Sequence, residues 1–331
     1  MPLTTVSYPI QLSLSMQRLR DGGRWSVFDP VDVPLLSETF GPDFTAAYAS
    51  YEASGLAIFD YDVGVLWSAV VESQRETGSP FLLFQDNING MSSSAIPVVR
   101  YRFRRVVLDR SNEAHLGIIQ SSNLCTEIVQ FSSPSQPAVC TLASISLPAC
   151  VDCDGTFNFI RLQGIVRVAV VNTDRCIDVS EYPTPAVAVS ARRTRALGVG
   201  VQGLADVFKL LGLPFSSMGA RELNISIFET IYYSALDASC LLAEEHGPYP
   251  AWAGSPASRG ILQVDMWGVT PSTRHDFAAL RARIARFGLR NSVITALMPT
   301  ASTSKLLGNF ESFEPYTRYL ASSSALRLAA Y

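Results

Sequence analysis

The feature of this sequence that most limits its fold is a change of apolar period near Gly203. Residues 197–201 alternate Leu or Val with glycine, which is the two-residue period of a strand, and a helix is predicted to begin near Gly203. The glycines of this GVGVQG run lack the GxGxxG spacing of a nucleotide-binding loop, so we assign them to close backbone packing. A strand that leads directly into a helix is the building unit of an α/β fold.

Similar elements flank this unit on both sides. Apolar residues recur at helical spacing from Leu162 to Val170. Helices closed by a glycine are predicted over residues 44–53, 63–76, 219–245 and 276–287, and strands over residues 81–84, 128–131 and 292–297. Residues 1–40 contain Asp29-Pro30 and Val33-Pro34 steps and are interpreted as a connector. The order of elements predicts an α/β domain with a largely parallel sheet.

A candidate site lies in the stretch SSNLCTEI, residues 121–128. Alternate side chains of an extended backbone point to the same face, so Asn123, Cys125 and Glu127 are expected to converge. A carboxamide orients a hydroxyl, a carboxylate accepts its proton, and a thiol between them performs redox or nucleophilic chemistry. Cys140 is a candidate second thiol for the same pocket. The structural alternative is a buried cysteine beside a surface acid, because a free cysteine behaves as a small core residue.

A second candidate site follows the predicted strand 292–297. The chain continues there as MPTAST, residues 298–303, and then as a helix through Leu307. A strand, a loop of small and hydroxyl residues, and a helix start together present backbone N–H groups to a phosphate. Ser302 and Thr303 fit this role, but Ser and Thr are also the ordinary caps of helices.

Two further patterns have both a functional and a structural interpretation. Cys150 and Cys153 form a CxxC pair, which occurs in thioredoxin-like proteins and in zinc sites. Without a second such pair a metal site is not expected, while a redox role stays open. Residues 90–109 contain four arginines among aromatic residues, a weak pattern for RNA or anion binding that is better explained as an irregular insertion.

The composition argues against a nucleic-acid-binding, a membrane-spanning or a secreted disulfide-rich protein. The chain of 331 residues is 48% hydrophobic and 17% charged, as in globular proteins, and its net charge of −3 gives no general attraction for nucleic acid. The N-terminus lacks the basic start and apolar core of a signal peptide, and no apolar run approaches the ~20 residues that cross a bilayer. Six cysteines in a chain of this length indicate free thiols in the cytoplasm rather than a secreted disulfide scaffold. Neither a nucleic acid nor a membrane is expected as a partner.

Five stretches of the sequence together point to one family. In chain order they are SSNLCTEI, AVCTLAS (138–144), GVQGLADVF (200–208), IFETIYYSAL (227–236) and MPTAST. With these stretches the chain resembles the large catalytic subunit of class I ribonucleotide reductase. The resemblance runs from about Trp25 to Thr317, but members of that family pass directly from the equivalent of residues 85–87 to that of residues 110–112. Residues 90–109 therefore look inserted. The expected division is a connector (1–40), part of the barrel domain (41–317) and a divergent tail (318–331).

The resemblance implies a fold and a set of residue roles. The implied fold is an incomplete ten-stranded α/β barrel, with a central loop that carries the catalytic cysteine. Cys125 would become a thiyl radical that removes hydrogen from the ribose of a ribonucleoside diphosphate, on the way to deoxyribonucleotides for DNA replication. Glu127 would take the proton of the 3′-hydroxyl, Asn123 would orient the sugar hydroxyls, and Cys140 would be half of a dithiol that ends as a disulfide. The residues implied to bind substrate are Ser122, Asn123, Glu127, Thr300, Ala301, Ser302 and Thr303.

The same resemblance implies partners and missing parts. The radical would come from a di-iron small subunit, nucleotide effectors would bind outside this segment, and the chain itself would hold no cofactor and no metal. Thioredoxin or glutaredoxin would restore the dithiol, and the full-length protein would be a cytoplasmic homodimer. The partner thiol of Cys140 is expected upstream of Met1, and the radical relay beyond Tyr331.

Three interpretations are therefore open. The chain is a fragment of a ribonucleoside-diphosphate reductase that is active only when completed, or it is an inactive truncated chain that acts at most as an interaction protein. The third interpretation is an unrelated CxxC redox protein.

Overall fold

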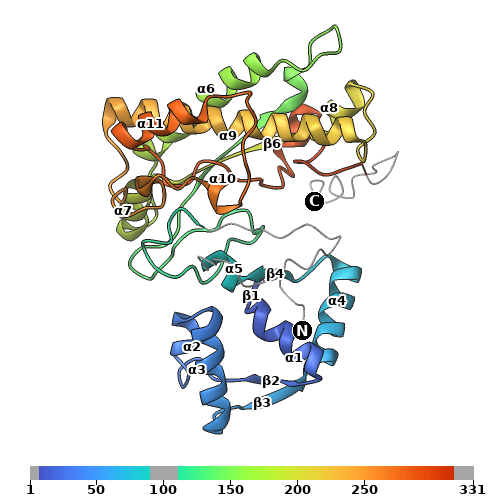
Figure 1. Cartoon of the computed structure of the whole chain (residues 1–331), viewed down its shortest axis with the longest axis vertical. Helices are drawn as coiled ribbons and strands as arrows, with labels where there is room; N and C mark the ends of the chain where they lie inside the picture. The colour runs from blue at the N-terminus through green and yellow to red at the C-terminus, as the bar shows by residue number, and fades with distance from the viewer. Residues whose placement is uncertain (1–6, 90–110, 317–331) are drawn as a thin grey trace.

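A computed structural model describes residues 7–89 and 111–316; the suspected insertion at 90–109 and the divergent tail at 318–331 lie outside these residues. Figure 1 shows two groups of elements, one that contains α1 to α5 and one that contains α6 to α11. The described residues contain six strands in three two-stranded sheets and no closed barrel, as expected for an incomplete barrel. No helix in these two ranges is long and apolar enough to cross a membrane.

The first group combines two small sheets with helices. Its elements are β1 (Ser7–Ile10), α1 (Leu12–Asp21), β2 (Arg24–Val27), α2 (Leu35–Glu38), α3 (Gly41–Ala53), β3 (Phe59–Asp62), α4 (Val63–Thr77), β4 (Phe81–Phe84) and α5 (Gln85–Asn89). Strand β1 pairs with β4 in parallel, and β2 pairs with β3 antiparallel. Leu14, Phe44 and Tyr48 form a small core. The helices predicted at 44–53 and 63–76 and the strand predicted at 81–84 are confirmed as α3, α4 and β4.

Residues 7–40 contain four elements where the sequence indicated none. Helix α1 was not predicted because Leu12, Leu14 and Met16 alternate with polar residues. This two-residue period is typical of a strand. Its N-terminal cap comes from Asp86 of α5, whose carboxylate accepts hydrogen bonds from the backbone amides of Leu12 (3.3 Å) and Ser13 (3.0 Å). A cap that is supplied from more than seventy positions away leaves no local sign in the sequence.

The second group is built around one parallel strand pair. Its elements are β5 (Thr141–Ser146), α6 (Phe159–Val179), α7 (Pro185–Thr194), β6 (Leu197–Gln202), α8 (Leu204–Leu210), α9 (Met218–His246), α10 (Gln263–Met266), α11 (Phe277–Phe287) and α12 (Thr303–Leu307). Thr141 of β5 lies opposite Leu197 of β6, and Ser146 lies opposite Gln202. Helix α6 contacts both strands and also α9. The apolar stripes of α6, α9 and α11 are buried in the main core, so these three helix predictions are confirmed.

The strand predicted at 292–297 is wrong. The amide of Leu197 donates to the carbonyl oxygen of Val293. The amide of Val199, two residues further along β6, donates to the carbonyl oxygen of Ile294, which is only one residue further along its own segment. The pairing register therefore shifts by one residue, and a single bridge joins Val199 to Thr295. A shift of this kind interrupts a ladder in the same way as a bulge.

The strand predicted at 128–131 is also wrong. The backbone amide of Ile128 donates to Asn123 Oδ1 (3.1 Å), and that of Phe131 donates to Glu113 Oε2 (3.1 Å). Side chains thus occupy two of the donors that a strand ladder would need.

Candidate functional site

The SSNLCTEI segment is a turn rather than an extended strand. The backbone amide of Thr126 donates to the carbonyl oxygen of Asn123 (3.1 Å), and Thr126 has a φ of +62°, in the left-handed region. The carboxamide oxygen of Asn123 accepts from the amide of Ile128 (3.1 Å) and the hydroxyl of Ser122 (3.2 Å). The prediction that an extended backbone aligns three side chains is therefore wrong, because Asn123 folds the segment back on itself.

Glu127 nevertheless lies within electrostatic range of both candidate thiols. Cys125 is an exposed free thiol; its partial desolvation raises its pKa, and the charge of Glu127 raises it further. Burial raises the pKa of Cys140 to about 12, with added contributions from the charges of Glu113 and Glu127. The Oε2 atom of Glu127 is buried and has no hydrogen-bond partner among the described residues. Both thiols therefore lose their protons less readily than a free cysteine does.

Cys140 lies against the parallel strand pair. It directly precedes β5, and a Cβ at Gly198 of β6 would be 3.3 Å from its sulfur. A Cβ at Gly200 would be 2.4 Å from the carbonyl oxygen of Ala296. The assignment of these glycines to close packing is therefore confirmed.

The MPTAST loop lies at the opposite end of the same strands. Thr303 Oγ1 is 3.4 Å from the hydroxyl of Ser144 on β5, and that hydroxyl accepts from Gln202 Nε2 of β6 (2.8 Å). Ser302 stands at the N-cap position of α12, but its side chain makes no capping hydrogen bond. The loop thus meets the carboxyl ends of two parallel strands, the edge at which open α/β sheets bind ligands.

Backbone geometry divides the MPTAST loop into buried and exposed parts. Thr300 is buried with a φ of +56°, and its hydroxyl oxygen accepts from the backbone amide of Ser312 (2.8 Å). Ala301, Ser302 and Thr303 are exposed. Thr300 therefore shapes the loop, and the next three residues are the ones open to a ligand.

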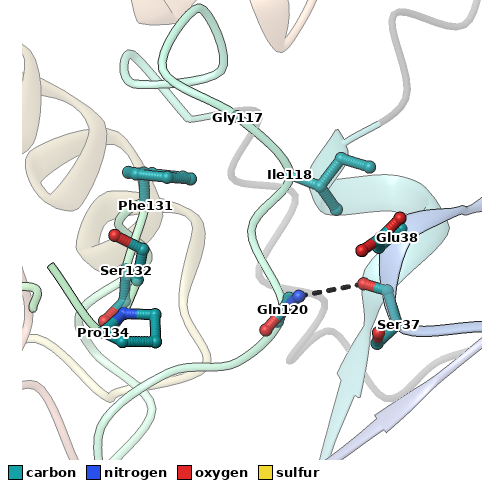
Figure 2. A pocket seen from close by; sticks show the side chains of 9 residues that line it. Ser37, Glu38, Gly117, Ile118, Gln120, Phe131, Ser132 and Pro134 are labelled. Carbon is teal, nitrogen blue, oxygen red and sulfur yellow. Dashed lines mark hydrogen bonds between the residues drawn. The ribbon is translucent and has the colours of Figure 1, made fainter. Parts of the chain in front are cut away.

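A pocket of about 390 Å³ opens beside the cysteine segment, but it is not lined by the candidate residues (Figure 2). Its wall comes from α2, from residues 117–120 and from residues 131–134. Gln120 Nε2 donates across it to the carbonyl oxygen of Ser37 (2.9 Å). Asn123, Cys125 and Glu127 lie outside this pocket.

Glu113 is a titratable residue of this region that the sequence analysis missed. Its side chain is almost fully buried, at 1% exposure, and burial raises its pKa to about 7. The hydroxyl of Ser292 donates to one carboxyl oxygen (2.6 Å) and the amide of Phe131 to the other. The nearest sign in the sequence is the RSN match at 110–112, which ends one residue before Glu113.

The CxxC pair does not form a shared site. Cys150 is fully buried, and burial raises its pKa to about 11, whereas Cys153 is exposed; both are free thiols. Within residues 7–89 and 111–316, no group of three His, Cys, Asp or Glu side chains is arranged to hold a metal ion.

Comparison with known proteins identifies the family. The family model described as "Ribonucleotide reductase, barrel domain" matches residues 10–327. The ribonucleoside-diphosphate reductase large chain of Neurospora crassa is 46% identical over 305 residues, which is 92% of this chain and 31% of that protein. The large chain of Schizosaccharomyces pombe and the large subunit of Danio rerio are each 46% identical over 304 residues, or 92% of this chain and 35% and 36% of those proteins.

The chain thus spans about a third of the length of the curated relatives that it matches. Both the family match and the identity extend over most of the chain. The chain therefore belongs to the ribonucleotide reductase family, as part of the barrel domain of the large subunit.

Proposed function

We propose that this chain forms the part of a ribonucleoside-diphosphate reductase large subunit at which the ribose is reduced. The observation that carries the proposal is the barrel-domain match over residues 10–327, and it is supported by the charge of Glu127, which raises the pKa of both Cys125 and Cys140. Removal of a sugar hydroxyl needs a group that takes hydrogen, a base for a neighbouring hydroxyl and a thiol that supplies electrons. Cys125 would take the hydrogen, Glu127 would be the base, and Cys140 would be the thiol that supplies electrons.

In the proposed reaction each residue has one step. Cys125, as a thiyl radical, takes a hydrogen atom from the ribose and later returns it, while Glu127 Oε2 accepts the proton of the 3′-hydroxyl. One ribose C–O bond is replaced by a C–H bond, and the oxygen leaves as water. Cys140 and a second thiol supply two electrons and two protons, and they end as a disulfide. Cys125 would become the thiyl radical by losing one electron and one proton to the radical that the di-iron small subunit of the family would provide.

Substrate binding would extend from the cysteine segment to the MPTAST loop. Ser122 and Asn123 would contact the sugar, and the exposed residues 301–303, on the loop that Thr300 shapes, would hold the diphosphate. Cys140 precedes Ser144 by four residues, or about 13 Å of extended strand, so the ligand must be long enough to reach both ends. The side chain of Ser302, which caps no helix, would be available to a phosphate oxygen. Thioredoxin or glutaredoxin would reduce the disulfide, in a cytoplasmic homodimer of the complete protein.

A chimera tests this proposal. Residues 10–316 replace the matched segment of the Schizosaccharomyces pombe large chain, and the product is assayed with the small subunit, a dithiol and ribonucleoside diphosphates. We expect deoxyribonucleotide formation that falls by at least about a thousandfold in Cys125→Ser. Cys176→Ser is the matched control, because Cys176 is an exposed free thiol on α6. A folded chimera that makes no product, or one whose activity survives Cys125→Ser, contradicts the proposal.

A further inference from the structure

Gln202 is a fully buried residue to which the proposed reaction gives no role. It is the last residue of β6, and its exposure is 0%. Its Nε2 atom donates to Ser144 Oγ on β5 (2.8 Å), and its Oε1 atom accepts from Nδ2 of Asn309, which lies two residues after the end of α12 (3.1 Å). The carboxamide of Gln202 thus presents a donor to one neighbour and an acceptor to the other.

The side chain of Asn309 determines which way round the Gln202 carboxamide lies. One hydrogen of Asn309 Nδ2 points to Gln202 Oε1, and the other points to Ser146 Oγ (2.8 Å). The segment that carries Asn309 is itself fixed, because the carbonyl oxygen of Phe310 accepts from the amide of Gly203 (2.9 Å). A Gln202 carboxamide turned over would bring two donors together, so its nitrogen must face β5.

The hydroxyl of Ser144 extends this direction to Thr303. Its oxygen accepts from Gln202 and lies 3.4 Å from Thr303 Oγ1. If Thr303 donated to Ser144, the Ser144 oxygen would accept twice and its own hydrogen would lose Thr303 as its acceptor. With Ser144 as the donor, the hydroxyl hydrogen of Thr303 is left to point away from the strands, and Thr303 is exposed. We call the side chains of Asn309, Gln202, Ser144 and Thr303 the Gln202 network.

The direction of the Gln202 network matches what a diphosphate needs. At neutral pH the oxygens of a diphosphate act almost entirely as acceptors, so a site for them must present donors. We propose that Gln202 is a positioning residue for the diphosphate of the substrate: it fixes the hydrogen of Ser144 toward Thr303, and the Thr303 hydroxyl therefore meets the ligand as a donor. This inference deepens the proposed function and rests on it, because Thr303 is one of the residues proposed to hold the diphosphate.

Gln202→Glu tests the direction of the network, because it keeps the shape of the side chain and replaces the donor with an acceptor. An ionised carboxylate would accept from Ser144, which would then accept from Thr303, so the donor would turn away from the ligand. We expect the dissociation constant of CDP, measured by calorimetry on the chimera described above, to rise about tenfold at pH 8. At pH 6 the rise should be smaller, because a buried carboxyl that has regained its proton can again donate to Ser144.

Steady-state kinetics of the same chimera separate a positioning role from general damage. Gln202→Glu should raise KM for CDP about tenfold and change kcat less than about threefold, because the diphosphate is bound alike in the ground state and in the transition state. Ser146→Ala is the matched control. Ser146 lies on the same strand as Ser144 and also accepts from Asn309, but it is outside the Gln202 network, so KM should stay within about twofold.

A second pair of variants tests the network without changing the buried carboxamide. Ser144→Ala should raise the dissociation constant of CDP about threefold, because Thr303 loses the neighbour that orients its hydroxyl. Thr303→Val removes that hydroxyl and should raise the constant about three- to tenfold. If Ser144 acts through Thr303, adding Ser144→Ala to Thr303→Val has no further effect.

Equal CDP affinities in the chimera and in its Gln202→Glu variant overturn the inference. A ratio of the two affinities that is the same at pH 6 and pH 8 also overturns it, because it indicates structural damage. If Gln202→Glu does not fold, additive effects of Ser144→Ala and Thr303→Val overturn the inference and non-additive effects support it. A chimera that binds CDP in the expected pattern but forms no deoxyribonucleotide contradicts only the proposed function, and a folded chimera that does not bind CDP overturns the inference.

Discussion

At the scale of single residues, Gly198 is the position where a side chain would disturb the site most directly. A Cβ there would lie 2.4 Å from Leu142 Cδ2, 3.0 Å from the Cβ of Ala296 and 3.3 Å from Cys140 Sγ. We predict that Gly198→Ala lowers the free energy of unfolding by about 1 kcal/mol, measured in urea, because the exposed Leu142 side chain must turn away and Ala296 must shift to make room.

Gly164 provides the matched control for this substitution. It lies on the exposed side of α6, and a Cβ there would meet nothing within 4 Å. Gly164→Ala should therefore stabilise the chain by about 0.5 to 1 kcal/mol, because alanine favours a helix. A Gly198→Ala chain as stable as the original would contradict the close packing of β5 on β6.

The candidate site was predictable only in part from the sequence. The residue types of SSNLCTEI are visible at once, and the proximity of Glu127 to Cys125 follows from their separation by two positions. The turn itself was not predictable, because it depends on the carboxamide of Asn123 bonding to the amide of Ile128. Glu113 was missed because its burial and its bond to Ser292 arise only when segments 179 positions apart come together.

At the scale of elements, the N-terminus of α1 depends on one side chain of α5. We predict that Asp86→Ala destabilises the chain by about 1 kcal/mol, because two backbone amides lose their acceptor. Hydrogen exchange should accelerate in α1 and stay unchanged in α3. Asp86→Asn retains an acceptor oxygen and should lose less than half as much. Equal exchange rates for α1 in Asp86→Ala and in the original chain would show that this cap contributes nothing.

Elements with strong local signals were the ones predicted correctly. Helices α6, α9 and α11 carry apolar stripes at helical spacing, and α9 and α11 are followed by Gly247 and Gly288. Helix α1 has the apolar period of a strand, and its first amides are capped by Asp86, which is distant in the sequence. The segment 292–297 has strand-like composition, but the register shift against β6 prevents a ladder. The predictions for α1 and for residues 292–297 failed because hydrogen bonds to distant segments, and not the local sequence pattern, determine the structure there.

At the scale of the whole molecule, residues 111–136 join the two groups of elements (Figure 1). Toward the first group, the carboxamide of Asn89 on α5 both donates to and accepts from the backbone of Ile119 (2.8 and 2.7 Å). Toward the second group, His115 Nε2 is 2.7 Å from the carbonyl oxygen of Ala251, and Arg193 donates to Gln136 Oε1 (2.5 Å). The cysteine segment is therefore held from both sides, so changes in global stability also affect the site.

Glu113 gives this global stability an unusual dependence on pH. Its pKa is raised from 4.5 to about 7 on folding, so the folded chain binds more protons than the unfolded chain between these values. The contribution of Glu113 is therefore fully present below about pH 4.5 and is lost as the pH rises through 7, by about 3 kcal/mol in total. Glu52 acts in the opposite sense at lower pH, because its hydrogen bond with Arg18 lowers its pKa and its contribution is lost as the pH falls.

The difference in unfolding free energy between Glu113→Gln and the original chain isolates this effect from Glu52 and from all other groups. Measured in urea from pH 4.5 to pH 8, the difference should change by about 3 kcal/mol in favour of Glu113→Gln, because the amide has no charge to bury. Ser292→Ala retains the carboxyl, so its difference from the original chain should vary much less over the same range. A Glu113→Gln difference that is constant with pH would mean that the Glu113 carboxyl titrates alike in the folded and unfolded chains.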